Sequence, residues 1–378
     1  MLSVVFLLGT LLCACGGGRS NGASTPPGPP SPATLTAEAP TISASTSNGA
    51  RNGAVIVTLS SATSGSKIYY TLDGSEPTTA SQQYQAPILV ASNLTIKAMA
   101  THSESSASAV ASKSFMSNIA SGTLVWSEEF TNTSTANGQP NPSTWTYDIG
   151  TNCCGNNELE TYCGWASTSG PCDPANPNAY VGTDGALHIV AQQPKPGTPV
   201  YTSARLKSQG LFSFQYGRIE ARMKLPESQG MWPAFWLLGD NIVTDRWPAC
   251  GELDIMEHID GNHPPIGGAG RGYDWVQSSV HGTKLDGGTP YTATGFSAAG
   301  WHRYGMIWTK GRIQYYIDDP SQVYETFTAA TQTGNWPFDS GPQFILLNLA
   351  VGGSWPGLPN LSTVFPSQVL VDYVRIYR

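Results

Sequence analysis

The stretch WPACGELDIMEH, residues 247–258, carries three carboxylates, Glu252, Asp254 and Glu257, in an otherwise apolar run. Only 12% of the chain is charged, so this cluster is not typical of a solvated acidic surface. Side chains alternate between the two faces of a strand, which puts Glu252 and Asp254 on one face and Glu257 on the other. A β-bulge at residues 255–256 would add one residue and bring all three acids to one face.

Three carboxylates this close cannot all ionise freely, because each anion raises the pKa of its neighbours. A proton donor beside an ionised carboxylate is suited to cleaving a glycosidic bond. Two alternative interpretations use the same residue types: a cation-binding site and an acid cluster with a purely structural role. The apolar alternation indicates a flat strand and not a loop of cation ligands, so the pattern favours glycosidic chemistry over metal binding.

The rest of the chain predicts an all-β protein. Strand-like alternation recurs at residues 187–192, 302–309, 312–318 and 343–351, and no segment shows a sustained helical period. We therefore expect a large β-sandwich over residues 117–378. Shorter alternating runs broken by turn residues predict a small β-sandwich over residues 38–116.

The N-terminus reads as an export segment followed by a tether. Residues 1–15 are apolar and too short to span a bilayer, and residues 16–37 are mainly Gly, Ser, Pro and Thr. The end of the apolar run, LCAC, resembles a bacterial lipoprotein processing box in which Cys15 is lipidated. We expect an exported lipoprotein at the cell surface or outer membrane, with plain secretion after cleavage near Ala14 as the alternative.

The run GELDIMEHID, residues 251–260, resembles the E-x-D-x-x-E active-site strand of glycoside hydrolase family 16. It has the bulged form of the laminarinases, the endo-β-1,3-glucanases of that family. Further blocks resemble the family in the same order along the chain: LVWSEEF (124–130), NNELETY (156–162), YGRIEARMKLP (216–226), GMWPAFWLLG (230–239), VHG (280–282), WPFD (336–339), FILLNLAVGGSWPG (344–357) and VDYVRIY (371–377).

The resemblance implies a jelly-roll β-sandwich with a substrate cleft and a retaining mechanism. Glu252 matches the nucleophile, Glu257 the acid/base and Asp254 an assisting carboxylate. In retaining enzymes the two working carboxyl groups lie about 5 to 5.5 Å apart. No cofactor is expected for catalysis.

The resemblance also implies the residues that bind the sugars. On composition alone, each tryptophan is more often core and a lone histidine more often structural. Glu158 and Glu160, beside Asn157, would ordinarily be interpreted as solvated charges in a loop. The implied substrate-binding residues are Asn157, Arg205, Trp232, Trp236, Trp247 and His281.

The formal net charge of −7 and the absence of basic clusters argue against nucleic acid and anionic lipid as partners. A neutral β-glucan fits better, and we expect an endo-acting β-1,3-glucan hydrolase that works as a monomer. The alternatives are a β-1,3-1,4-glucanase or a transglycosylase on the same scaffold. A non-catalytic glucan-binding protein is disfavoured by the intact acid triad.

Four cysteines, Cys153, Cys154, Cys163 and Cys172, cluster in a loop rich in Gly, Asn and Pro. In an exported chain they are expected to form two disulfides of open pairing, with zinc binding as the alternative. Cys250 is left over and is expected to be a buried thiol.

Two accessory features are implied by resemblance. IYYTLDGSEPT, residues 68–78, resembles the immunoglobulin-like domain at the C-terminus of chitobiases and hexosaminidases. It is expected to be a spacer, with glycan stacking on Tyr69 and Tyr70 as the alternative. A structural calcium matches the main-chain oxygens of Glu129 and Gly185 and the carboxylate of Asp372.

Overall fold

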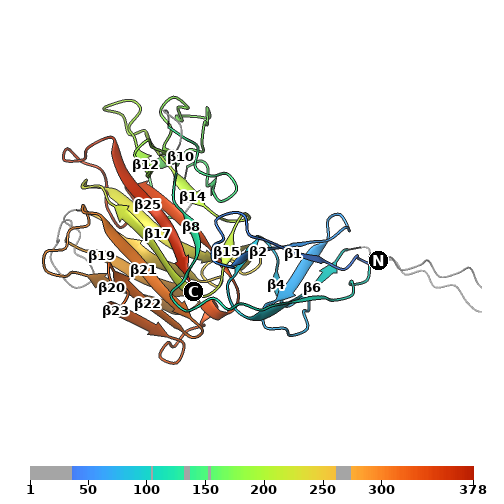
Figure 1. Ribbon diagram of the computed structural model, residues 1–378. Helices are drawn as coiled ribbons and strands as arrows, with labels where there is room; N and C mark the ends of the chain where they lie inside the picture. The colour runs from blue at the N-terminus through green and yellow to red at the C-terminus, as the bar shows by residue number, and fades with distance from the viewer. Residues whose placement is uncertain (1–35, 104, 132–136, 152–154, 261–273) are drawn as a thin grey trace, which may run out of the picture. The chain divides into compact units, whose positions relative to one another are not determined.

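The computed structural model describes residues 36–103, 105–131, 137–151, 155–260 and 274–378, and these are built from β-strands (Figure 1). The described helices are two short 3-10 turns, η1 (Asp240–Val243) and η2 (Pro337–Asp339). No helix in this part of the chain has the length and apolar character needed to cross a membrane. The all-β prediction is therefore confirmed. The predicted export segment with Cys15, and the loop residues Cys153 and Cys154, lie outside the described residues.

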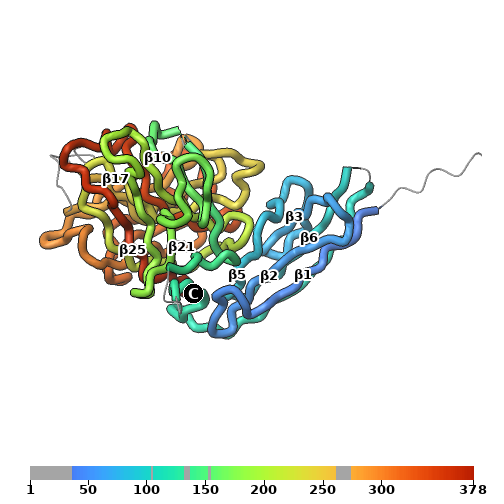
Figure 2. Tube along the Cα trace, turned by 90° about the horizontal axis from the view of Figure 1, so that it is seen from above, coloured from blue at the N-terminus to red at the C-terminus, as the bar shows by residue number. Residues whose placement is uncertain are grey.

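The first seven strands form a small two-sheet unit. Val57 and Ile96 are buried between its sheets, because alternate residues of each strand point inward. Tyr70 is 2% exposed and packs edge-on against Tyr84, so it belongs to the core, whereas Tyr69 on the other face is partly exposed. On one side, β1 (Thr41–Ser45), β2 (Val55–Ser60) and β5 (Ile88–Val90) lie side by side in Figure 2, and the parallel pairing of β5 with β15 (Ser213–Phe214) joins them to a larger sheet. The other sheet consists of β4 (Gln82–Gln83), β3 (Lys67–Thr71), β6 (Leu94–Thr101) and β7 (Ala111–Phe115).

The larger part of the chain contributes two antiparallel sheets. The first, here called the β25 sheet, joins the two ends of this part, because β8 pairs with the last strand. Its strands are, in order, β11 (Ala179–Val181), β12 (Leu187–Ala191), β25 (Ser367–Tyr377), β16 (Gly217–Lys224), β21 (His302–Thr309), β22 (Arg312–Ile317) and β23 (Val323–Thr328), with β8 (Leu124–Glu128) beside β25.

The second, here called the β18 sheet, contains the acidic strand. In order, it runs through β15 (Ser213–Phe214), β24 (Gln343–Val351), β17 (Met231–Gly239), β18 (Glu252–Glu257), β19 (Val276–Gly282) and β20 (Leu285–Tyr291). β14 (Arg205–Lys207) pairs with β24 and with β9 (Thr146–Tyr147), and a separate parallel pair joins β10 (Glu160–Tyr162) to β13 (Tyr201–Ser203).

The two faces of the β18 sheet differ in chemistry. Leu237, Leu253 and Met256 point into the main core, where each is fully buried among aromatic and aliphatic side chains. The opposite face carries a smaller apolar cluster that includes Trp236 and Cys250. The polar side chains of β18 emerge on that second face, which is therefore the site-bearing face.

Candidate active site

A β-bulge at Ile255 places the three acids. Along β18, Trp236 pairs with Asp254 and the next residue of β17, Phe235, pairs with Met256, so Ile255 is the extra residue. The pairing with β19 shifts at the same place. Ile255 is 1% exposed and lies in the core. Because it is one residue in excess, the alternation of faces shifts by one and Glu257 lies on the same face as Glu252 and Asp254. The bulge expected from the sequence is confirmed.

The entry into β18 depends on glycine. Gly251 has a φ of +85°, and a Cβ there would meet Pro337 Cγ at 2.8 Å and the ring of Phe338 at 3.1 Å. Only a residue without a side chain fits this turn and this contact. The position of Glu252, the next residue, is therefore fixed by the backbone at Gly251.

Two tryptophans donate hydrogen bonds to the outer acids. Trp247 Nε1 donates to Glu252 Oε2 at 2.8 Å, and Trp232 Nε1 donates to Glu257 Oε1 at 3.0 Å. Trp247 is 58% exposed, a large value for an indole that is tied to a carboxylate. These bonds orient both acids and leave indole faces at the surface of the site.

All three acids hold their protons more tightly than free carboxyl groups. Burial raises the pKa of Asp254 to about 7, and burial together with the charge of Asp254 raises the pKa of Glu252 to about 8. Burial, Asp254 and Glu252 together raise the pKa of Glu257 well above its usual range. Glu257 is thus the acid that keeps its proton longest, which suits a proton donor.

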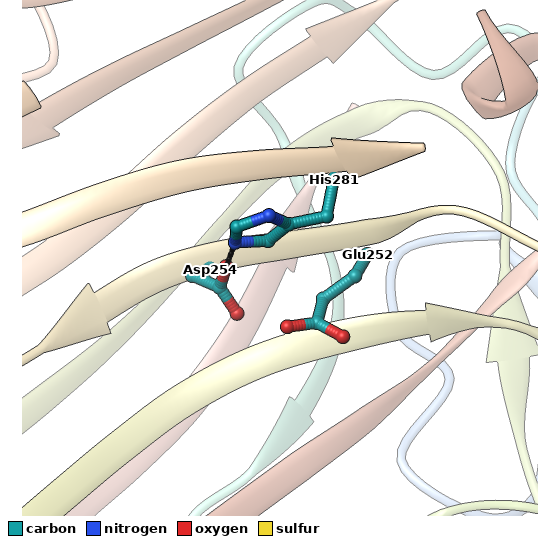
Figure 3. A group of neighbouring side chains, drawn as sticks. All are labelled: Glu252, Asp254 and His281. Carbon is teal, nitrogen blue, oxygen red and sulfur yellow. Dashed lines mark ion pairs between the residues drawn. The ribbon is translucent and has the colours of Figure 1, made fainter. Parts of the chain in front are cut away.

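His281 approaches the acids from the neighbouring strand. It lies opposite Glu252 in the β18–β19 register and opposite Asp286 in the β19–β20 register. Its Nε2 atom lies 3.1 Å from Asp254 Oδ2, and its Nδ1 atom lies 2.8 Å from Asp286 Oδ1. Figure 3 shows His281, Asp254 and Glu252 pointing toward one another from two adjacent strands.

A cationic and aromatic surface continues along the same face. The guanidinium of Arg205 lies 4.5 Å from the ring centre of Trp236, whose Nε1 donates to Asn348 Oδ1 at 2.8 Å. Arg205 also forms an ion pair with Asp148 at 3.0 Å. Trp236 and Arg205 are each only 9% exposed, so the two groups pack against each other and present little free surface.

The profile of glycosyl hydrolases family 16 matches residues 174–375, and that of the chitobiase/beta-hexosaminidase C-terminal domain matches residues 46–112. A beta-glucanase from Rhodothermus marinus is 36% identical over 266 residues, which cover 68% of this chain and 85% of that protein. The chain belongs to glycosyl hydrolases family 16. It is thus a glycoside hydrolase, and the resemblance seen in the sequence is confirmed.

Two further relatives agree with this family. The laminarinase catalytic domain, an endo-1,3-beta-glucanase, from Thermotoga petrophila RKU-1 superimposes with a TM-score of 0.56 at 34% identity, covering 68% of this chain and 97% of that one. Glucan endo-1,3-beta-glucosidase A1 from Niallia circulans is 32% identical over 290 residues, which cover 69% of this chain and 38% of that protein.

The expectation that Glu158 and Glu160 are solvated loop charges is wrong for Glu160. Glu160 is 2% exposed and accepts a hydrogen bond from the Val351 amide at 2.7 Å, so it is a buried carboxyl and not a solvated charge. Burial and the nearby charge of Glu158 raise the pKa of Glu160 to about 8. Asn157 itself is exposed and donates to Ser354 Oγ at 2.9 Å.

Trp355 is a site residue that the sequence argument did not single out. Its ring lies edge-on to Trp232 at 5.4 Å and edge-on to Trp275 at 6.0 Å. It therefore supports the indole that holds Glu257. The signal was present in the block GGSWPG of this family 16 chain, but the sequence does not show that β17 and this segment adjoin.

The remaining expectations concern cysteines and calcium. Cys163 and Cys172 form a disulfide, which settles one pairing that the sequence left open, and Cys250 is a buried free thiol, as expected. In the predicted calcium site, Asp372 Oδ2 accepts a hydrogen bond from Arg222 Nη1 at 2.8 Å. A guanidinium at the only carboxylate of this ligand set does not fit a calcium ion, so no role is derived from it.

Proposed function

We propose that this family 16 enzyme is a retaining endo-β-1,3-glucanase. The observation that carries the proposal is the bulge at Ile255, which puts Glu252, Asp254 and Glu257 on one face of one strand. The glucanase names of the relatives described above support the substrate class. The neutral polymer also fits a site whose face combines indoles with few basic groups.

In the first step, the carboxylate of Glu252 attacks the anomeric carbon and forms a covalent glycosyl ester. Glu257 gives its proton to the glycosidic oxygen as the bond to the leaving sugar breaks. Trp247 restricts the nucleophile to the rotamer in which it is observed, because its indole already holds Oε2. Trp232 does the same for Glu257.

In the second step, Glu257 acts as a base and takes a proton from water, which attacks the same anomeric carbon and releases Glu252. Two displacements on one carbon retain its configuration. Asp254 lies between the two acids, and its charge raises the pKa of Glu257 and so helps to keep the proton there. The same charge raises the pKa of Glu252, whose ionised form is favoured instead by His281 and by the hydrogen bond from Trp247.

Sugar binding is assigned to the aromatic and polar groups around the acids. The exposed indole of Trp247 and that of Trp232 offer flat faces to pyranose rings, and Arg205 and Asn157 offer hydrogen-bond donors beyond Trp236. His281 reaches the site from β19 on the far side of β18. These side chains surround the acids on three strands and two loops.

The test is release of reducing sugar from laminarin, barley mixed-linkage glucan, agarose and carrageenan. Wild type is compared with Glu252→Gln and Glu257→Gln, which keep the shape of each side chain. We expect rapid release from laminarin that falls by about 10³-fold or more in both variants. Release only from mixed-linkage glucan would change the assigned substrate to that polymer. No release from any polymer by folded wild type would overturn the proposal.

We also propose that the protein is a monomeric lipoprotein, lipidated at Cys15 and tethered to a surface by residues 16–37. The composition of this segment supports the proposal. Labelling with a fatty acid in wild type and in Cys15→Ser tests the anchor, and sedimentation tests the monomer. Equal labelling of both chains would exclude the anchor.

A further inference from the structure

A histidine and two carboxylates converge on the site-bearing face. One ligand atom each of Glu252, Asp254 and His281 can be chosen so that all three lie within 4.8 Å of one another (Figure 3). A nitrogen ligand together with carboxylate oxygens is a donor set for zinc and its neighbours in the transition series. Calcium and magnesium prefer six or more oxygens.

The contact between His281 and Asp254 has the geometry of two ligands of one ion. His281 Nε2 lies 3.1 Å from Asp254 Oδ2, yet this buried oxygen receives no hydrogen bond of ordinary geometry from the described residues. Ligand atoms about 2.0 to 2.2 Å from a tetrahedral zinc lie roughly 3.4 Å apart, with the ion off the line between them. The observed pair is close to that spacing.

The groups behind the cluster orient its ligand atoms. Asp286 Oδ1 lies 2.8 Å from His281 Nδ1, where it can accept a hydrogen bond from Nδ1–H, and in that tautomer the lone pair of Nε2 is directed at Asp254. Carboxylate behind histidine is the usual support for a zinc-binding imidazole. Trp247 Nε1 donates a hydrogen bond to Oε2 of Glu252, which leaves Oε1 as the ligand atom available to an ion.

The cluster is open to solvent on one side. Asp254 is 3% exposed, whereas the His281 side chain is 26% exposed and Glu252 is only partly buried. An ion can therefore enter from the site-bearing face. Two carboxylates and a neutral imidazole balance its charge, and water completes the coordination.

We propose that Glu252, Asp254 and His281 form an inhibitory site for Zn²⁺ or a similar transition-metal ion. The ion occupies the oxygen that attacks the sugar, so it competes with substrate. The inhibition rests on the proposed function, but the binding does not. The three ligand atoms lie within 4.8 Å of one another, so coordination requires Glu252 to move closer to His281 and Asp254.

The first measurement is calorimetric titration of the full chain with ZnCl₂ in buffer without phosphate or chelator. We compare wild type with His281→Gln and Asp286→Asn, and with His302→Gln as a control. His302 also pairs with an aspartate, Asp318 at 2.7 Å, but on the β25 sheet. Zinc held by Cys153 and Cys154 would appear equally in every variant.

We expect His281→Gln and Asp286→Asn to weaken zinc binding by about tenfold or more, and His302→Gln to leave it unchanged. Equal affinity in wild type and His281→Gln would overturn the site. If His281→Gln does not fold, judged by circular dichroism, Asp254→Asn replaces it. The visible spectrum of added Co²⁺ supplies an independent readout, because tetrahedral coordination gives intense absorption that must disappear in the same variants.

The second measurement is laminarin hydrolysis with ZnCl₂, with CaCl₂ and with chelator added after zinc. We expect competitive inhibition by zinc alone that the chelator reverses. If His281→Gln loses zinc binding but the wild type does not hydrolyse laminarin, the metal site is supported and the proposed function is wrong. Inhibition by zinc that persists unchanged in Asp286→Asn would contradict the metal site while leaving the glucanase intact.

Discussion

The indole of Trp247 donates a hydrogen bond to Glu252 across 2.8 Å, although more than half of that indole is exposed. The bond favours the ionised carboxylate and lowers the pKa of Glu252 against the effects of burial and Asp254. A residue at the rim of the site thus controls the protonation of the proposed nucleophile.

Trp247→Phe should raise the pKa of Glu252, because the donor is lost and the ring is kept. The nucleophile must be ionised, so the acidic limb of the kcat/KM profile should move to higher pH by about one unit. Activity at low pH falls most. The measurement is the pH dependence of kcat/KM on laminarin, with Trp301→Phe, beside Arg222 on the β25 sheet, as control. An unmoved acidic limb would contradict this role.

Trp232→Phe should act on the opposite limb. Its indole donates to Glu257 and lowers the pKa of that acid, so removal raises it further. Glu257 must be protonated in the first step, and the basic limb of kcat/KM should therefore move to higher pH by about one unit. The same profile measures it. A shift of the acidic limb instead would mean that Glu257 is not the proton donor.

Asp240 should make the stability of the protein fall as pH rises. It is 1% exposed, and burial raises its pKa to about 7, with Ser213 opposing the shift. A carboxyl with a pKa raised by folding binds its proton in the folded state, so stability is lost between pH 4 and pH 7.

Asp240→Asn removes that loss. Relative to wild type, we expect it to be more stable at pH 8 by on the order of 3 kcal/mol, seen as a Tm higher by several degrees, and little changed at pH 4. Thermal unfolding followed by circular dichroism at both pH values gives the comparison. Parallel pH dependence in the two proteins would show that Asp240 is not the responsible group.

Local pattern was enough to predict the strands and the face of the acids. Strict alternation along residues 252–257 would put Glu257 on the face opposite to Glu252 and Asp254. A bulge at Ile255 brings it to the same face. The all-β fold follows from the same period in other segments. This information lies within six residues, so it can be read without knowing the neighbouring strands.

Contacts between distant segments could not be predicted in this way. Glu160 is buried because Val351, far along the chain, offers it an amide, and nothing in NNELETY indicates that partner. Asp286 reaches His281 only because the β19–β20 hairpin pairs these two residues. The burial of Trp236 depends on Arg205, which comes from another strand. Residue type predicted the chemistry, but register decided the partners.

The most direct test of the central claim separates the roles of Glu252 and Glu257 by the anomer formed with azide. The substrate is an aryl β-laminaribioside with a good leaving group, which reacts without acid assistance. Azide then enters where the missing carboxyl group no longer acts, and proton NMR identifies the glycosyl azide.

With Glu257→Ala, azide should attack the ester of Glu252 and give the β-azide. With Glu252→Ala, azide should displace the leaving group directly and give the α-azide. This pair of outcomes would establish Glu252 as nucleophile and Glu257 as acid/base on one bulged strand. The same anomer from both variants, or the reverse pair, would contradict the account.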